Sequence, residues 1–455
     1  MPKRPINADV PAPEDEETQA PEPENASPAK ETPPAPKEEK SAKPPRRREP
    51  KSPTPKLLAA LVVLALAFIA AAIVFGGGSG GDEDPTSAAP MPAPAPTDET
   101  ASGDGPSTPT AAELGYPAFA TNNTVRIGGS DPTANAAGAA LAAFPSTTAE
   151  QRPGAVTVVG EEDWAGAIAA AVLMAPPVRA PILFSSPDEL PEASEEALAA
   201  LDPQGSEETG GAPLFAIGTV AYPGEAAPVD SGDPAGTAAQ IATLRDRLFG
   251  KPPRHIVIAS SARPDFAMPA AAWAARSGDP VLYSEPDELP PPTAAFLEQH
   301  PKVPVYVLGP SEVISKEVVG EIGKVSKRVS RVAGEDPVAN AIALARYRDG
   351  DFGWNVNDPG HGFVLARSDS PADAAAAAPL SASGTWGPLL LTDAAEALPP
   401  QLRGYFLDVK PGYTDDPTRA FYNHVWVVGD QEAISVSQQA EVDALAELAK
   451  IGGEE

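Results

Sequence analysis

A short apolar run that ends in a polar turn occurs three times in the chain, at Pro181–Pro191, Pro280–Pro290 and Pro388–Pro399. Each run begins with Pro and three large, mostly apolar residues, continues through Ser, Thr, Asp or Glu, and closes with Leu-Pro. An unbroken apolar run of this length is typical of a strand that is buried on both faces, as in a parallel sheet. The Leu-Pro pair marks the boundary before a helix. We therefore expect three buried strands, each followed by a turn and a helix.

A second repeated feature is an Asp-Pro pair, which recurs with a period of about 100 residues. The pairs are Asp131-Pro132, Asp233-Pro234 and Asp336-Pro337, and an Ala-rich segment follows each. Asp at the N-cap and Pro at the first helical position explain the pairing. Each pair therefore predicts the start of a helix.

Other segments follow each pair in the same order. An apolar strand is expected at 155–159, 255–259 and 362–366, and a last one at 214–218, 303–309 and 425–429. Between the first of these strands and the Pro-initiated strand, Asp163, Asp265 or Asp373 opens a second Ala-rich run. The order helix, strand, helix, strand, helix, strand predicts a small parallel sheet with right-handed crossovers in each repeat, and hence an α/β fold.

The predicted domain organisation divides the chain into six parts. They are a disordered tail at 1–56, a transmembrane helix at 57–75, a flexible Pro/Gly/Ser-rich linker at 76–116, and three repeats at 117–227, 228–326 and 327–450. The tail has almost no large apolar side chains to bury. The third repeat carries additional loops at 348–361 and 410–423.

The membrane prediction rests on residues 57–75, which contain no charged residue, Gly or Pro. At about 1.5 Å per residue they match the roughly 30 Å of bilayer hydrocarbon. Arg46–Arg48 precede this span and Asp82–Asp84 follow it, so we expect a cytoplasmic tail and extracellular repeats. A cleaved signal peptide is the alternative, but its apolar core is shorter and it does not follow a long tail.

Composition excludes several classes of function. The chain has 33 Lys and Arg against 63 Asp and Glu, a net charge of -30, whereas a nucleic-acid binder presents a basic surface. It has no Cys, so disulfides and thiolate chemistry are excluded. Its four His residues do not form an HExxH motif. We predict no catalytic residue, no metal site and no cofactor.

At this point the ordered motifs resemble the type-two cell wall-binding repeat of Gram-positive surface proteins, which usually occurs in three copies. Arg126 to Asp131 and Arg331 to Asp336 match the opening of that repeat, and the three Pro-initiated strands match its Pro-Ile-Leu-Leu strand. The resemblance covers roughly residues 120 to 440. It departs from the family where Pro132, Pro234 and Pro337 replace a second Arg, and where the second repeat has Asp230 at the position of the first Arg.

The resemblance implies three tandem Rossmann-like units in a pseudo-threefold arrangement. It also implies non-covalent binding of an anionic wall polysaccharide along the grooves between the units, near the Pro-Ile-Leu-Leu strands. The transmembrane helix expected at 57–75 predicts a location at the cell membrane, and the resemblance implies that the repeats are associated with the cell wall.

Two groups of residues are candidates for polymer contact. Arg126 and Arg331 carry the planar fork that suits a phosphate or a uronate, although each could equally pair with a nearby carboxylate. Asp188-Glu189 and Asp287-Glu288 follow a predicted strand, where parallel sheets place their ligand sites. Turn formation is the alternative explanation for the acidic pairs.

The first hypothesis is therefore a non-catalytic, membrane-anchored protein that binds a wall polymer. One alternative is an envelope hydrolase that uses paired carboxylates in the grooves. Another is a membrane scaffold that signals through a partner of its cytoplasmic tail.

Overall fold

The computed structural model describes residues 122–451, which belong to one compact unit of the chain. The predicted tail, membrane helix and linker lie outside the described residues. Within residues 122–451, none of the helices combines the length and the apolar character that crossing a membrane requires.

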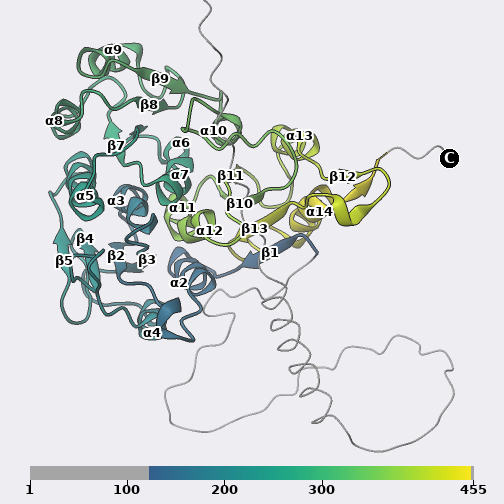
Figure 1. Cartoon of the computed structure of the whole chain (residues 1–455), viewed down its shortest axis with the longest axis horizontal. Helices are drawn as coiled ribbons and strands as arrows, with labels where there is room; N and C mark the ends of the chain where they lie inside the picture. Colours follow the sequence, from purple (N-terminus) through teal and green to yellow (C-terminus); the bar gives the residue numbers. More distant parts are fainter. Residues whose placement is uncertain (1–121, 452–455) are drawn as a thin grey trace, which may run out of the picture. The chain divides into compact units, whose positions relative to one another are not determined.

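Three four-stranded parallel sheets form the framework of the described residues (Figure 1), which confirms the predicted repeats of small parallel sheets. The first sheet has the order β3-β2-β4-β5, from Ile182–Ser185, Val156–Gly160, Leu214–Ile217 and Ala227–Val229. The second has the order β7-β6-β8-β9, from Val281–Ser284, Ile256–Ser260, Val305–Leu308 and Val329–Val332. The third has the order β11-β10-β13-β1, from Leu389–Thr392, Gly362–Arg367, His424–Val428 and Thr124–Ile127.

The strand that opens each sequence repeat joins the sheet of another repeat. β5 pairs with β4, β9 pairs with β8, and β1 at the start of the described residues pairs with β13 near their end. The helix that follows each opening strand instead packs on the next sheet, because α2 contacts β3, α5 contacts β7 and α10 contacts β11. These opening helices span Pro132–Ala143, Pro234–Phe249 and Pro337–Arg346. The chain thereby ties the three sheets together.

The predicted helix starts at the Asp-Pro pairs are confirmed. The carboxylates of Asp131, Asp233 and Asp336 each accept a hydrogen bond from a backbone N–H three residues later, at 2.8 Å. Pro occupies the first helical position in all three. Capping of this kind stabilises a helix by about 1 kcal/mol.

The middle helices of the three repeats pack against one another between the sheets (Figure 1). They are α3 (Trp164–Ala170) with the short helix η2 (Ala171–Met174), α6 (Pro264–Ala267) with α7 (Pro269–Ser277), and α11 (Pro371–Ala376) with α12 (Ala378–Ala382). η2 contacts α7, α7 contacts α12, and α11 contacts α3. Almost all of their Ala residues are buried, and the small side chain lets the backbones approach closely.

The prediction that an Asp opens each middle helix is correct for one repeat and wrong for two. Asp163 is the N-cap of α3, but the N-cap positions of α6 and α11 are Arg263 and Ser370. Asp265 lies in the first turn of its helix and forms an ion pair with Arg263. Asp373 is buried and accepts a hydrogen bond from Asn135 Nδ2 at 2.9 Å. The loop that precedes the helix differs in sequence among the repeats, so the Asp residues do not occupy equivalent positions.

The helices after the Pro-initiated strands are confirmed as α4 (Glu192–Leu201), α8 (Pro291–Gln299) and α13 (Pro400–Asp408), with Pro191, Pro290 and Pro399 at their N-caps. In the second and third sheets the last strand is followed by a further helix, α9 (Lys316–Val325) or α14 (Val436–Ala446), capped by Ser315 or Ser435. The first sheet has no such helix, since β4 leads directly to β5 through residues 218–226.

The remaining elements are short. They are η1 (Ala149–Gln151), η3 (Pro417–Arg419), and the paired strands β12 (Gly412–Tyr413) and β14 (Ala449–Lys450). The additional loop at 348–361 carries Phe352, whose ring stacks on Tyr306 of β8 at 3.5 Å between centroids. Trp354 from the same loop contacts Trp273 of α7 edge to face. This loop thus fills the junction between the second and third repeats.

Candidate functional site

The carboxyl ends of the strands in each sheet lie at one edge, because all the strands are parallel. In the second sheet the loop after β8 runs from Gly309 to Ser315, and in the third sheet the loop after β13 runs from Gly429 to Ser435. These two loops connect the sheet edge to α9 and α14. Each is held by one of the two Arg residues that the sequence singled out.

Arg126 lies on β1 and is only 2% exposed. Its Nη1 donates to the carbonyls of Gly429 and Asp430 at 2.7 and 2.6 Å, and its Nη2 donates to the carbonyl of Ile434 at 2.7 Å. Its Nε donates to Oε1 of Gln439 at 3.0 Å. The guanidinium is therefore fully engaged with the loop after β13 and with α14.

Arg331 on β9 makes the equivalent contacts and is half-buried. It donates to the carbonyls of Gly309 at 2.6 Å and Pro310 at 3.0 Å, and to those of Ile314 at 2.7 Å and Ser315 at 3.3 Å. We call this arrangement the arginine clamp: one guanidinium on the edge strand that gathers the carbonyls at both ends of the neighbouring loop.

The clamp places a positive charge in an environment with little water. Burial lowers the pKa of both guanidinium groups, and the carboxylates of Asp430 and Glu312 oppose that shift for Arg126 and Arg331 respectively. An Arg side chain stays protonated at physiological pH all the same. The partners of both Arg residues are backbone carbonyls, together with the Gln439 side chain for Arg126, rather than the carboxylate that the sequence analysis proposed as the alternative. A polymer phosphate could contact Arg126 only by displacing these bonds.

The clamp is absent from the first sheet, and the strand register corrects which residue stands in its place. Arg126 lies opposite Val427 and Arg331 opposite Val307, each one residue before the last residue of its strand. The equivalent residue of β5 is Pro228, which lies opposite Ala216. The prediction that Asp230 occupies this position is therefore wrong, because Asp230 follows the strand.

The two acidic pairs lie in exposed turns on different sheets. Asp188 and Glu189 follow β3, and their backbone N–H groups donate to Ser186 Oγ at 3.3 and 3.0 Å. Asp287 and Glu288 follow β7, and the carbonyl of Glu288 accepts a hydrogen bond from Ser284 Oγ at 3.1 Å. Both pairs thus take part in turns at the carboxyl ends of edge strands, while their side chains remain exposed. The structure does not bring the two pairs together in one site.

A cavity of about 290 Å³ lies at the carboxyl ends of β1, β10 and β13, where the first repeat meets the third. Its walls include the turn at Ser130–Asp131 from the first repeat and Arg367, Asp369 and Glu432 from the third. Arg367 forms a bidentate ion pair with Asp369, at 3.0 and 2.6 Å, which raises the pKa of the guanidinium and lowers that of the carboxyl.

A second cavity, of about 470 Å³, shares Ser130 and Asp131 and extends towards Glu161 and Pro191. Burial raises the pKa of Glu161, and the negative charge of Asp131 adds to the rise. We call the two cavities together the junction groove. It is acidic, so a polyanion could bind there only through Arg367 or through bridging cations. The sequence analysis did not identify Arg367 as a candidate. Its position directly after the predicted strand at 362–366, where parallel sheets bind ligands, could have indicated it.

Three of the carboxyl groups that line the junction groove have structural roles. Asp131 caps α2, Asp369 pairs with Arg367, and Asp373 is buried against Asn135. Burial raises the pKa of Asp373, which favours its protonated form. Among residues 122–451 there is also no cluster of His, Asp or Glu suited to a metal ion.

Comparison with known proteins defines the repeats further. The model of the family "Cell wall binding domain 2 (CWB2)" matches residues 230–319 and 331–439. These two stretches are cell wall binding domain 2 repeats, as the sequence motifs suggested. No curated protein matches the sequence.

Two solved structures share the fold. Cwp8 from Clostridium difficile aligns with a TM-score of 0.53 at 21% identity, covering 70% of this chain and 51% of its own. Cwp6 from Clostridium difficile aligns with a TM-score of 0.55 at 19% identity, covering 72% of this chain and 50% of its own. This chain therefore spans about half the length of either protein.

Proposed function

We propose that the protein is a membrane-anchored component of the cell envelope that binds an anionic wall polysaccharide non-covalently through its three repeats. The observation that carries the proposal is the junction groove, which lies at the carboxyl ends of parallel strands in a chain with two cell wall binding domain 2 repeats. Parallel sheets bind ligands at this edge. The proposed role is binding rather than catalysis, because Asp131 serves as a helix cap and Asp369 as the ion-pair partner of Arg367.

In this proposal the exposed acidic pairs Asp188-Glu189 and Asp287-Glu288 contact the polymer through divalent cations, since a net charge of -30 opposes direct attraction of a polyanion. Arg126 and Arg331 support binding indirectly, by holding the loops at the sheet edges. A chelator should then release the protein from walls, and replacing all four carboxylates by amides should remove the effect of the chelator.

The test of the groove is sedimentation of the full-length protein with purified walls, intact or stripped of anionic polymer. Ser130→Trp places a large side chain between the two cavities of the groove and should weaken binding to intact walls by about tenfold or more. Glu317→Trp on the exposed face of α9 is the matched control. Equal sedimentation with intact and stripped walls would show that an anionic polymer is not the ligand.

The membrane part of the proposal concerns residues 57–75, with the tail in the cytoplasm and the repeats outside. Carbonate extraction of membranes should leave the full-length chain in the pellet and release a variant that lacks residues 57–75. A full-length chain that is also released would contradict an integral anchor. A chain that stays in the pellet would place any partner of residues 1–56 on the cytoplasmic side.

A further inference from the structure

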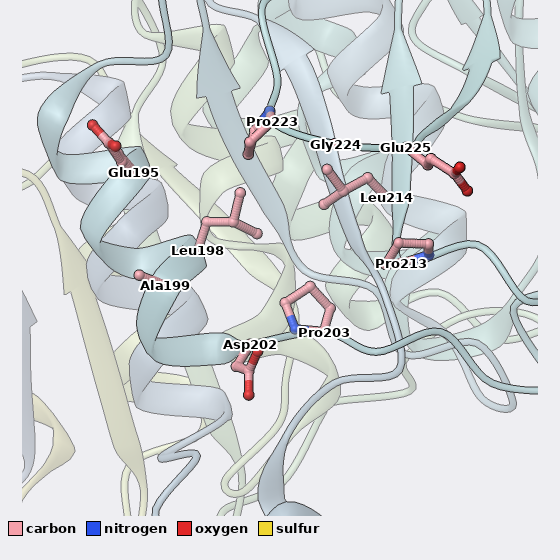
Figure 2. A pocket seen from close by; sticks show the side chains of 10 residues that line it. All are labelled: Glu195, Leu198, Ala199, Asp202, Pro203, Pro213, Leu214, Pro223, Gly224 and Glu225. Atoms are coloured by element: carbon pink, nitrogen blue, oxygen red, sulfur yellow. The ribbon is translucent and has the colours of Figure 1, made fainter.

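The first repeat contains an apolar groove beside α4. A cavity of about 350 Å³ lies between α4 and the loop that joins β4 to β5. Figure 2 shows Leu198, Leu214 and Pro223 around this space, with Ala199 on the same helix and Glu195 one turn earlier. We call it the α4 groove.

The other two repeats show what covers the equivalent surface. α9 packs on α8 and buries Val318 and Ile322, while α14 packs on α13 and buries Val442 and Leu445 among others. Both covering helices also contact the edge strand of their own sheet. In the first repeat the connection between β4 and β5 is only residues 218–226, and no helix forms in it. The α4 groove therefore corresponds to the surface that α9 covers in the second repeat and α14 covers in the third.

Burial at the floor of the groove agrees with this difference. The seventh residue after the N-cap Pro is Leu198 in α4, Leu297 in α8 and Phe406 in α13. Their exposed fractions are 8%, 1% and 0%. The position is most exposed in the repeat that lacks the covering helix.

The charges indicate what kind of helix would fit. In the third repeat Arg403 Nε of α13 donates to Glu441 of α14 at 2.8 Å. Arg403 is the fourth residue after the N-cap Pro, and the equivalent residue of α4 is the exposed Glu195. Asp202 and Glu225 add further negative charge at the walls of the groove. The first repeat thus carries a carboxylate at the position where the third repeat carries the guanidinium.

We propose that the α4 groove binds a short amphipathic helix of a partner protein, with apolar side chains at i and i+4 and a Lys or Arg opposite Glu195. The partner helix takes the place that α9 and α14 occupy in the other repeats. The junction groove reaches only the start of α4, at Pro191 and Ala193, whereas this site lies further along the helix, from Glu195 to Asp202. Its occupant is a peptide rather than a polysaccharide.

The experiment uses the full-length chain in nanodiscs and two labelled, hydrocarbon-stapled peptides of residues 435–446, one native and one carrying Glu441→Lys. Fluorescence anisotropy should show the Lys peptide binding about tenfold more tightly than the native peptide, because it places a cation rather than a carboxylate beside Glu195. If a peptide instead displaced α14 from α13 of the protein itself, the native peptide would bind more tightly, since Arg403 would repel the Lys peptide.

The matched protein variant is Glu195→Arg, which changes an exposed side chain and should reverse the preference between the two peptides. Ala199→Trp should abolish binding of both peptides by filling the groove. Thermal melting of each variant establishes that it folds. The proposal is overturned if the Lys peptide binds no more tightly than the native one, or if Glu195→Arg leaves the preference unchanged.

Discussion

The loop after β4 in the first sheet differs from the loops after β8 and β13 in two respects that occur together. The second and third sheets have an arginine clamp and a helix after the loop, whereas the first has Pro228 at the clamp position and no helix. If the Arg served mainly to bind polymer, its presence would be independent of the helix. The first sheet lacks both the Arg and the helix, which indicates that the clamp orders the loop and so positions the helix that follows it.

The largest effect should come from breaking the clamp of the third sheet. Arg126→Ala removes four hydrogen bonds from a site that is 2% exposed and leaves the carbonyls of Gly429 and Ile434 without their donor. We expect a loss of about 3 to 4 kcal/mol in the free energy of unfolding, measured by denaturant titration. Arg126→Lys keeps the charge without the fork and should recover only part of the loss. A loss below about 1 kcal/mol would contradict the clamp.

The clamp of the second sheet should be worth less, because Arg331 is half-buried and water can reach part of the loop. Arg331→Ala should lower the free energy of unfolding by about 2 kcal/mol. Hydrogen exchange should show the loss concentrated in residues 309–325, the loop and α9. Uniform exchange over the whole second sheet would mean that the Arg stabilises the sheet rather than the loop.

The contacts between repeats offer a second comparison. Asn135 Nδ2 donates to buried Asp373 at 2.9 Å, whereas the equivalent Asn340 Nδ2 donates to the carbonyl of Phe266 at 3.3 Å. Burial raises the pKa of Asp373 in the folded protein, so its protonated form favours folding. That contribution is complete below the unfolded-state pKa of about 3.9 and is lost as the pH rises through the folded-state value.

Asp373→Asn keeps the acceptor for Asn135 and removes the ionisation. We expect the variant to gain about 1 kcal/mol over the wild type at neutral pH and to lose that advantage in acid, measured as unfolding free energy against pH. Asn340→Asp provides a second comparison, since it places a carboxyl group against the carbonyl of Phe266 rather than against an amide donor. Parallel pH profiles for wild type and Asp373→Asn would show that Asp373 ionises freely.

The sequence predicted the elements that depend on local chemistry. The Asp-Pro caps and the apolar strands follow from residues within a few positions of one another. The pairing of β1 from the first repeat with β13 from the third could not be predicted, because the two strands are far apart in the sequence and no local pattern links them. The partners of Arg126 lie 303 or more residues away, and they are mostly carbonyls, which any residue provides. Asp230 was also misplaced, although counting was enough to correct it. Arg126 and Arg331 each lie five residues before the Asp of an Asp-Pro pair, and the residue five positions before Asp233 is Pro228, in agreement with the strand register.

The smallest effect should come from giving the first sheet the Arg that it lacks. Pro228 is exposed on an edge strand, where Pro is tolerated because its missing N–H is not needed. The loop that follows β4 begins differently from the other two, since Gly218 has φ of 74° while Gly309 and Gly429 both have φ of 101°. The backbone carbonyls of the loop after β4 are therefore not arranged like those of the loop after β8, which accept hydrogen bonds from Arg331. Pro228→Arg should change the free energy of unfolding by no more than about 0.5 kcal/mol in thermal or denaturant melts. A gain above about 1 kcal/mol would show that the loop can be clamped without a helix, and would remove the link between the two features.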